Sequence, residues 1–156
     1  MRKNEMYMSF LADSVNESLA RFTVAAFALE LNPTLEEFVD IRTSVSEAVT
    51  YAIILGYEEK EGMVEIHCVL LDRLLHIEIK DNGKGIPSKD LPNIFERFFR
   101  SDVSRNSAQG GSGIGLSIVH KVMEDHGGKV WATSREGEGT TMYFVLRKYQ
   151  EVPANE

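Results

Sequence analysis

Cysteine, proline and tryptophan are scarce in this chain of 156 residues. The single cysteine, Cys68, excludes an intramolecular disulfide, and its place in the alternating segment 64–71 suits an inert strand position. Four prolines and no biased tract leave no segment typical of a long linker. The most apolar run, 22–31, is too short to span a bilayer, and residues 1–5 lack the apolar stretch of a secretory signal. We therefore expect a soluble, unsecreted, cytoplasmic protein.

The charge balance is acidic, with 17 basic against 24 acidic side chains and a formal net charge of -7. Nucleic acid and anionic membranes both select a basic face, so we expect neither as a partner. One segment is locally basic, because Arg97, Arg100 and Arg105 are accompanied there only by the acid Asp102. Such a cluster is either solvated surface or an anion site, and charge alone leaves both open.

Hydrophobic periodicity predicts helices packed over a sheet. A strand is expected at 6–12, a helix at 15–31 capped by Asp13 or Ser14, and a second helix from Thr34 to about residue 56. Further strands are expected at 63–71, 74–80, 130–135 and 140–146, and a third helix at 114–126. The predicted fold is an α/β (α+β) two-layer sandwich, with a mixed, mostly antiparallel sheet and about three helices on one face. One domain, 1–150, and a tail, 151–156, are expected.

The motif Asp81-x-Gly83-x-Gly85 directly follows a predicted strand. A carboxylate fixed at a strand end can accept a hydrogen bond from the exocyclic amine of adenine, and glycines let a base approach the backbone. A tight turn with a capping aspartate has the same pattern. By itself the motif leaves both interpretations open.

Two more glycine-bearing motifs follow. Gly111-x-Gly113-x-Gly115 opens the third predicted helix, where free amides and the helix dipole favour a phosphate, although a flexible loop closing on a helix has the same pattern. In Gly139-Thr140-Thr141, between the last two predicted strands, a threonine hydroxyl could share the binding of adenine through a water. A plain hairpin turn explains that motif nearly as well.

Together these motifs resemble the GHKL superfamily, the Bergerat-fold ATPases and kinases that include gyrase, Hsp90, MutL and histidine kinases. The order matches: an acid-bearing helix, the Asp81 motif, the aromatic segment 95–100, the glycine loop and Gly139-Thr140-Thr141. Residues up to Tyr57 resemble the sporulation anti-sigma-F factors, which are serine kinases, and residues from about Lys80 resemble a sensor histidine kinase catalytic domain. This division suggests an engineered chimera joined between Tyr57 and Ile79.

The resemblance implies a role for each matching residue. Glu47 would be the general base or water-positioning acid of a magnesium site, Asp81 and Thr140 would bind adenine, and Gly83 and Gly85 would line the base pocket. The residues implied at the phosphates are Gly111, Gly113, Gly115, Arg100 and Arg105, with Arg97 nearby. ATP or ADP with magnesium is the implied cofactor, and a sigma factor or a second copy of the chain is the implied partner.

One helical stripe departs from the family pattern. The family has Glu, Asn and His at successive i, i+4 and i+8 positions, whereas this chain has Glu47, Tyr51 and Leu55. Magnesium requires hard oxygen ligands, and a neutral phenol is a poor substitute for the asparagine carbonyl. Tyr51 and Leu55 suit packing instead, which would make the metal site doubtful.

Two functions are therefore open: a kinase domain with weak or no phosphoryl transfer, or a non-catalytic module for dimerisation or sigma-factor binding. No histidine lies in a phosphoacceptor setting, so autophosphorylation is not expected. The segment 92–111 is predicted to form a mobile lid, because it offers few buried contacts.

Overall fold

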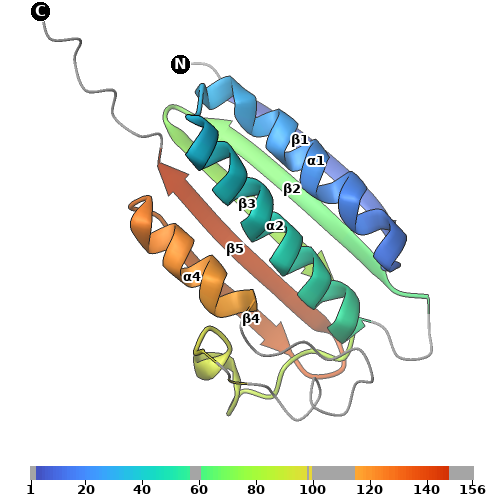
Figure 1. Ribbon diagram of the computed structural model, residues 1–156. Coiled ribbons are helices and arrows are strands. Elements are labelled where there is room, and N and C mark those ends of the chain that lie inside the picture. The colour runs from blue at the N-terminus through green and yellow to red at the C-terminus, as the bar shows by residue number, and fades with distance from the viewer. Residues whose placement is uncertain (1–2, 57–60, 98, 100–114, 148–156) are drawn as a thin grey trace, which may run out of the picture.

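In the part of the chain that the structure describes, three helices lie on one face of a five-stranded sheet (Figure 1). The computed structural model describes residues 3–56, 61–97, 99 and 115–147. The strands are β1 (Lys3–Leu11), β2 (Met63–Leu71), β3 (Leu74–Asp81), β4 (Lys129–Arg135) and β5 (Gly139–Arg147). The helices are α1 (Glu17–Ala28), α2 (Leu35–Gly56) and α4 (Gly115–Asp125), and short 3₁₀ turns occupy Ser14–Asn16, Leu29–Leu31 and Leu91–Asn93. The tail predicted at 151–156 lies outside the described residues.

The strands are ordered β1-β2-β3-β5-β4. All four pairings between these described strands are antiparallel, so the predicted two-layer sandwich is confirmed and its sheet has no parallel pair there. The register between β3 and β5 places Asp81 opposite Thr140. The sheet thus brings together two residues that the sequence assigned to the same ligand.

Helix ends follow the predicted capping chemistry. Thr34 Oγ1 accepts the Glu37 amide at 3.1 Å, and a Glu37 carboxylate oxygen accepts the Thr34 amide at 2.8 Å, which forms a reciprocal capping box at the start of α2. Asp13 accepts the Val15 amide at 3.1 Å. The helix predicted for 15–31 is shorter than expected, because 3₁₀ turns form both of its ends and Asn32, with φ of 52°, ends it in the left-handed region.

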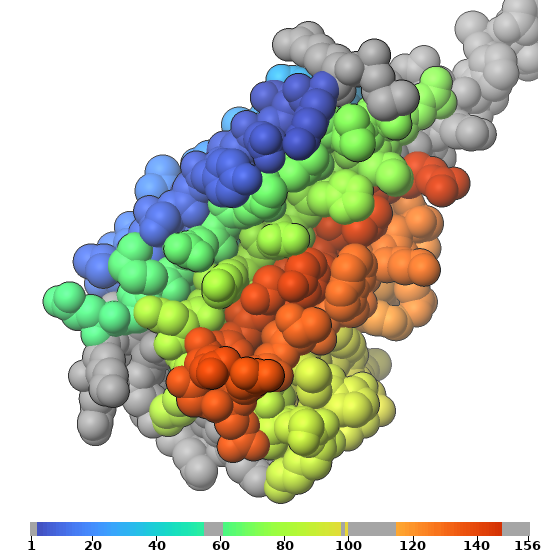
Figure 2. Space-filling view, turned by 180° about the vertical axis from the view of Figure 1, so that it is seen from behind, coloured from blue at the N-terminus to red at the C-terminus, as the bar shows by residue number. Residues whose placement is uncertain are grey.

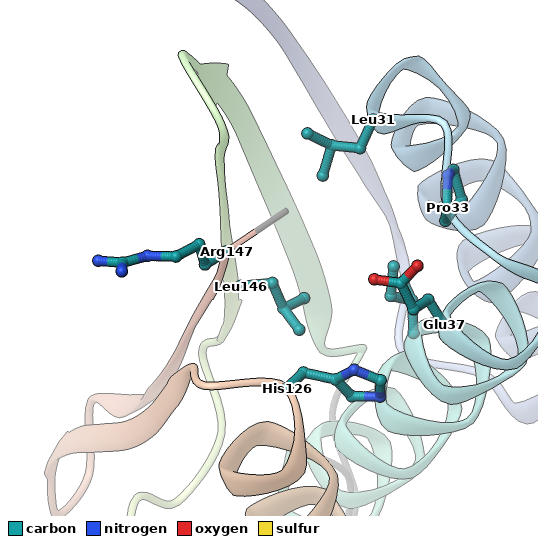
Figure 3. Close-up of a pocket in the computed structure, with 7 residues that line it drawn as sticks. Leu31, Pro33, Glu37, His126, Leu146 and Arg147 are labelled. Atoms are coloured by element: carbon teal, nitrogen blue, oxygen red, sulfur yellow. The ribbon is translucent and has the colours of Figure 1, made fainter. Parts of the chain in front are cut away.

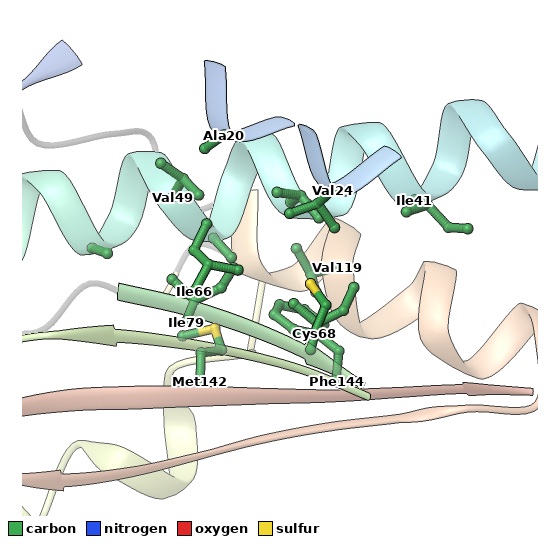
Figure 4. Close-up of a cluster of buried hydrophobic side chains, with 14 of the residues drawn as sticks. Ala20, Val24, Ile41, Val49, Ile66, Cys68, Ile79, Val119, Met142 and Phe144 are labelled. Carbon is green, nitrogen blue, oxygen red and sulfur yellow. The ribbon is translucent and has the colours of Figure 1, made fainter. Parts of the chain in front are cut away.

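The core fills the space between the helices and the inner face of the sheet (Figure 4). Ile66, Ile77 and Phe144 alternate inward from the central strands, and Val24 and Val49 meet them from α1 and α2. Cys68 is fully buried in β2, and burial raises the pKa of its thiol to about 12, so the prediction of an unreactive cysteine agrees with its position.

Among the described residues, no α-helix lies on the opposite face of the sheet (Figure 2). Cross-strand aromatic pairs cover part of it: Tyr7 stacks on His67 with ring centroids 4.0 Å apart, and Trp131 stacks on Tyr143 at 5.2 Å. Within the described ranges, no helix is both long and apolar enough to cross a membrane.

Candidate functional site

Asp81 is a buried carboxyl group at the end of β3, with a relative exposure of 3%. Its Oδ1 accepts the Gly83 amide at 2.9 Å. Burial raises the pKa of Asp81 to about 6, and hydrogen bonds from the Gly83 and Thr140 backbone groups partly oppose this rise. Thr140 is also buried, at 4%, and lies opposite Asp81 in the sheet. Burial and register thus give the inner face a carboxylate and a hydroxyl side by side.

Two glycines bring the loop after Asp81 against the β4–β5 turn. Gly85 has a φ of 75°, and a Cβ atom there would collide with the carbonyl group of Arg135. Gly139 has a φ of 126°, and a Cβ atom there would collide with the Asp81 carbonyl. Because the backbones approach so closely, a larger residue at either position would push the loop after Asp81 and the β4–β5 turn apart. Gly83, predicted to line a base pocket, contributes its amide to Asp81.

Ser134 in β4 contacts the candidate site residue Thr140, although no sequence motif pointed to it. Its Oγ accepts the Ile86 amide at 2.7 Å, donates to the Gly139 carbonyl at 2.9 Å and lies 2.9 Å from Thr140 Oγ1. The strand alternates between exposed and half-buried residues, and Ser134 falls on the half-buried side with Val130 and Ala132. The sequence did contain a signal for Ser134, because it is a polar residue on the otherwise apolar inner side of this strand.

Glu47 lies half-buried on α2 and faces the start of α4. A Cβ atom at Gly115 would collide with a carboxylate oxygen of Glu47, so the structure brings these two predicted site residues together. Burial, and then the neighbouring negative charge of Glu17, raises the pKa of Glu47. Glu17 itself accepts a hydrogen bond from Ser46 and pairs with Arg21 at 3.2 Å.

The α2 donor set does not fit a magnesium site. Glu47 supplies one carboxylate, and the half-buried Tyr51 packs against the hydrophobic core. In the part of the chain that the structure describes, no three His, Cys, Asp or Glu side chains are grouped to hold a metal ion. Magnesium prefers several oxygen ligands in octahedral order, and a carboxylate with a neutral phenol falls short of that.

Several predicted site residues lie outside the described residues: Arg100, Arg105, Gly111, Gly113 and the side chain of Leu55. Most of the predicted lid, residue 98 and residues 100–111, lies outside them too. In its described part Ile94 is buried, and Phe95 and Phe99 pack against the core.

A small hollow lies at the other end of the sheet, between α2, α4 and β5 (Figure 3). His126 lines it, and its Nε2 lies 2.7 Å from Asp40 Oδ2. This contact joins the end of α4 to α2, and the His126 side chain is only 10% exposed. His126 therefore has a structural contact that suits a packing role.

Comparison with known proteins assigns the chain to a family. Residues 37–150 match the model of the histidine kinase-, DNA gyrase B-, and HSP90-like ATPases. Because this match covers more than half of the chain, the chain belongs to that ATPase family.

Within this family its sequence relatives include anti-sigma F factors. That of Clostridium acetobutylicum is 44% identical over 150 residues, which cover 95% of each chain. That of Geobacillus stearothermophilus is 39% identical over 143 residues and 91% of each chain. A single relative thus aligns across both halves, and the suggestion of a chimera finds no support.

Solved structures of histidine kinases have the same fold. A mycobacterial sensor histidine kinase, MprB, matches with a TM-score of 0.61 and 30% identity, over 70% of this chain and 73% of that one. The catalytic domain of histidine kinase ThkA matches with a TM-score of 0.61 over 92% of this chain and 96% of that one. Its identity is 22%, so this second likeness concerns the fold alone.

Proposed function

We propose that the chain is an adenine-nucleotide-binding anti-sigma factor of the serine-kinase type, in which phosphoryl transfer is weak. The observation that carries the proposal is the buried Asp81 carboxyl group, held at a strand end beside Thr140. A carboxylate has four lone-pair positions, so it retains acceptor capacity after bonding to the Gly83 and Thr140 amides. The exocyclic amine of adenine supplies the matching donor.

The glycines around Asp81 support the same ligand. Gly85 and Gly139 hold two backbones in close contact, which fixes the carboxyl group before a ligand arrives. At the other side of the site, Gly115 opens α4 next to Glu47. Amides at a helix start favour a phosphate, and the half-buried Glu47 has a raised pKa suited to holding or accepting a proton.

Weak phosphoryl transfer is proposed because of α2. Transfer of a phosphoryl group depends on positioning and on neutralising the charge of the phosphates. Tyr51 packs against the core at the position where the family has asparagine, so a second oxygen ligand is missing beside Glu47. Nucleotide binding through the base does not need that ligand.

A binding role, with or without catalysis, is supported by α1 and the turns at its ends. Their exposed apolar residues are spaced alternately by four and three positions: Val15, Leu19, Phe22, Ala26 and Leu29. We call these five residues the α1 stripe. Val15 is 75% exposed and Phe22 is 52% exposed. Such spacing is typical of a seam that packs on another helix, which suits a sigma factor or a second copy of the chain.

Melting curves with ADP test the proposed nucleotide site. A ligand that binds only the folded state stabilises it, by about 2.7 kcal/mol at one hundred times its Kd. We expect ADP to raise the melting temperature in a chelating buffer, and Asp81→Asn to reduce this rise. No rise with millimolar ADP, with or without magnesium, would contradict nucleotide binding and leave only the binding role of α1.

A further inference from the structure

Ser134 joins its own strand, β4, to two other segments at the proposed adenine site, the loop after Asp81 and the start of β5. Its hydroxyl contacts the Ile86 amide on the loop after Asp81, the Gly139 carbonyl in β5 and the Thr140 hydroxyl. The donor–acceptor distances lie between 2.7 and 2.9 Å. These are short enough for three real hydrogen bonds.

The donors and acceptors of this group fix the direction of the bonds. A serine hydroxyl has one proton and two lone pairs. The Ile86 amide can only donate to Ser134, and the Gly139 carbonyl can only accept from it, so the serine proton is committed to Gly139. The remaining contact is then satisfied only if Thr140 Oγ1 donates its own proton to Ser134.

This direction leaves Thr140 as an acceptor toward the ligand. Its only hydroxyl proton is held by Ser134, so its oxygen offers lone pairs alone. Asp81 lies opposite it in the sheet, and a carboxylate also accepts. The inner face at this point therefore presents two acceptors together, and a ligand must bring hydrogen-bond donors to satisfy them.

We propose that Ser134 is a positioning residue that makes the site prefer a 6-amino purine over a 6-oxo purine. The inference rests on the proposed nucleotide site. At position 6 adenine carries an amine with two donor hydrogens, whereas hypoxanthine carries a carbonyl oxygen there, which is a third acceptor, and has only the N1–H donor beside it. Facing acceptors leave buried groups unpaired, which is a strong basis for rejecting a ligand. Without Ser134, the Thr140 hydroxyl could turn and donate to the carbonyl.

The test compares ADP with inosine diphosphate by titration calorimetry on the parent, Ser134→Ala, Ser134→Thr and Thr133→Ala. Ser134→Thr keeps the hydroxyl, and Thr133→Ala removes a hydroxyl from the outward side of the same strand. We expect Ser134→Ala to lower the preference for ADP by about tenfold, the scale of one hydrogen bond. The other two variants should keep the parental preference.

The ratio of the two affinities separates positioning from mere structural support. Partial unfolding lowers both affinities by the same factor, so the ratio is independent of the folded fraction. An unchanged ratio in Ser134→Ala, with ADP still bound by the parent, overturns this inference and leaves the nucleotide site in place. If the parent binds neither nucleotide, the proposed function fails and this inference fails with it.

Discussion

At the scale of a single residue, burial of the Asp81 carboxyl group makes its ionised form unfavourable for the stability of the fold. The pKa of Asp81 rises from an ordinary 3.8 to about 6. The folded state disfavours the ionised form. The contribution of Asp81 to the free energy of unfolding is therefore most favourable below about pH 4, and it is lost as the pH rises through about 6. The loss corresponds to about 3 kcal/mol at pH 7. We infer that the fold tolerates this cost for the sake of a ligand contact.

Asp81→Asn is therefore expected to have opposite effects on stability and binding. The free energy of unfolding should increase by about 1 to 3 kcal/mol at pH 7, and this gain should disappear below about pH 4. ADP affinity should fall by at least about 1.5 kcal/mol, because a bond to a charged group is lost. Urea denaturation at the two pH values, with calorimetry of ADP, measures both. Unchanged ADP affinity would remove Asp81 from the site.

The sequence predicted Asp81, Thr140 and their glycines because these residues form recognisable local motifs. Ser134 was missed for a physical reason: its role depends on three segments meeting, and only one of them is its own strand. Glu47 and Gly115 were predicted singly, but their contact arises from the packing of α4 near α2. Contacts between segments that are distant in the sequence cannot be predicted from local motifs.

At the scale of elements, the start of helix α2 is well predicted from its capping residues, and its later part differs from the family pattern at Tyr51 and Leu55. The predicted cap at Thr34 forms, and the helix reaches Gly56 as expected. The preceding helix was overestimated because apolar periodicity continues through its 3₁₀ ends. The hairpin between β2 and β3 turns at Asp72 with a φ of 58°, which explains a turn without glycine.

The capping box predicts a measurable loss on substitution. Thr34→Ala should lower the free energy of unfolding by about 1 kcal/mol, because the Glu37 amide loses its acceptor. Thr50→Ala is the matched control, since Thr50 lies exposed within the same helix. Chemical denaturation of both variants is the measurement. Equal stabilities would argue against the cap.

Restoring the family residues on α2 should exchange stability for function. Tyr51→Asn with Leu55→His removes packing at Tyr51 and should lower the free energy of unfolding by roughly 2 to 5 kcal/mol. Magnesium-dependent ATP affinity should rise at least about tenfold, or about 1.4 kcal/mol. Calorimetry of parent and double variant, with and without magnesium, decides this. If the affinities are equal, Tyr51 does not occupy the metal position.

At the scale of the whole molecule, the order of the strands in the sheet was the feature hardest to predict from the sequence. The element types predicted a sandwich, but pairing β3 with β5 rather than with β4 joins distant segments. That pairing brings two candidate site residues together, because it places Asp81 opposite Thr140. The sequence similarity to two kinase branches is accounted for by one family whose members share a fold.

The α1 stripe predicts association of the whole chain. Phe22 lies near its middle, with Arg21 and Arg42 over its ring at 5.0 and 5.9 Å. Phe22→Glu should weaken self-association or sigma-factor binding by tenfold or more, since a charge would be buried in an apolar contact. Sedimentation equilibrium of the parent and the variant measures this for the chain alone. Thr133→Glu, on the opposite face of the sheet, serves as the control. An unchanged association in Phe22→Glu would exclude the stripe.

The most direct test of the account is a calorimetric titration of the parent chain with ADP, first with a chelator and then with excess magnesium. Base recognition at Asp81 without a complete metal site predicts saturable binding under both conditions. The two dissociation constants should agree within about threefold, or roughly 0.7 kcal/mol. Binding that appears only with magnesium, or no binding in either buffer, would contradict the account.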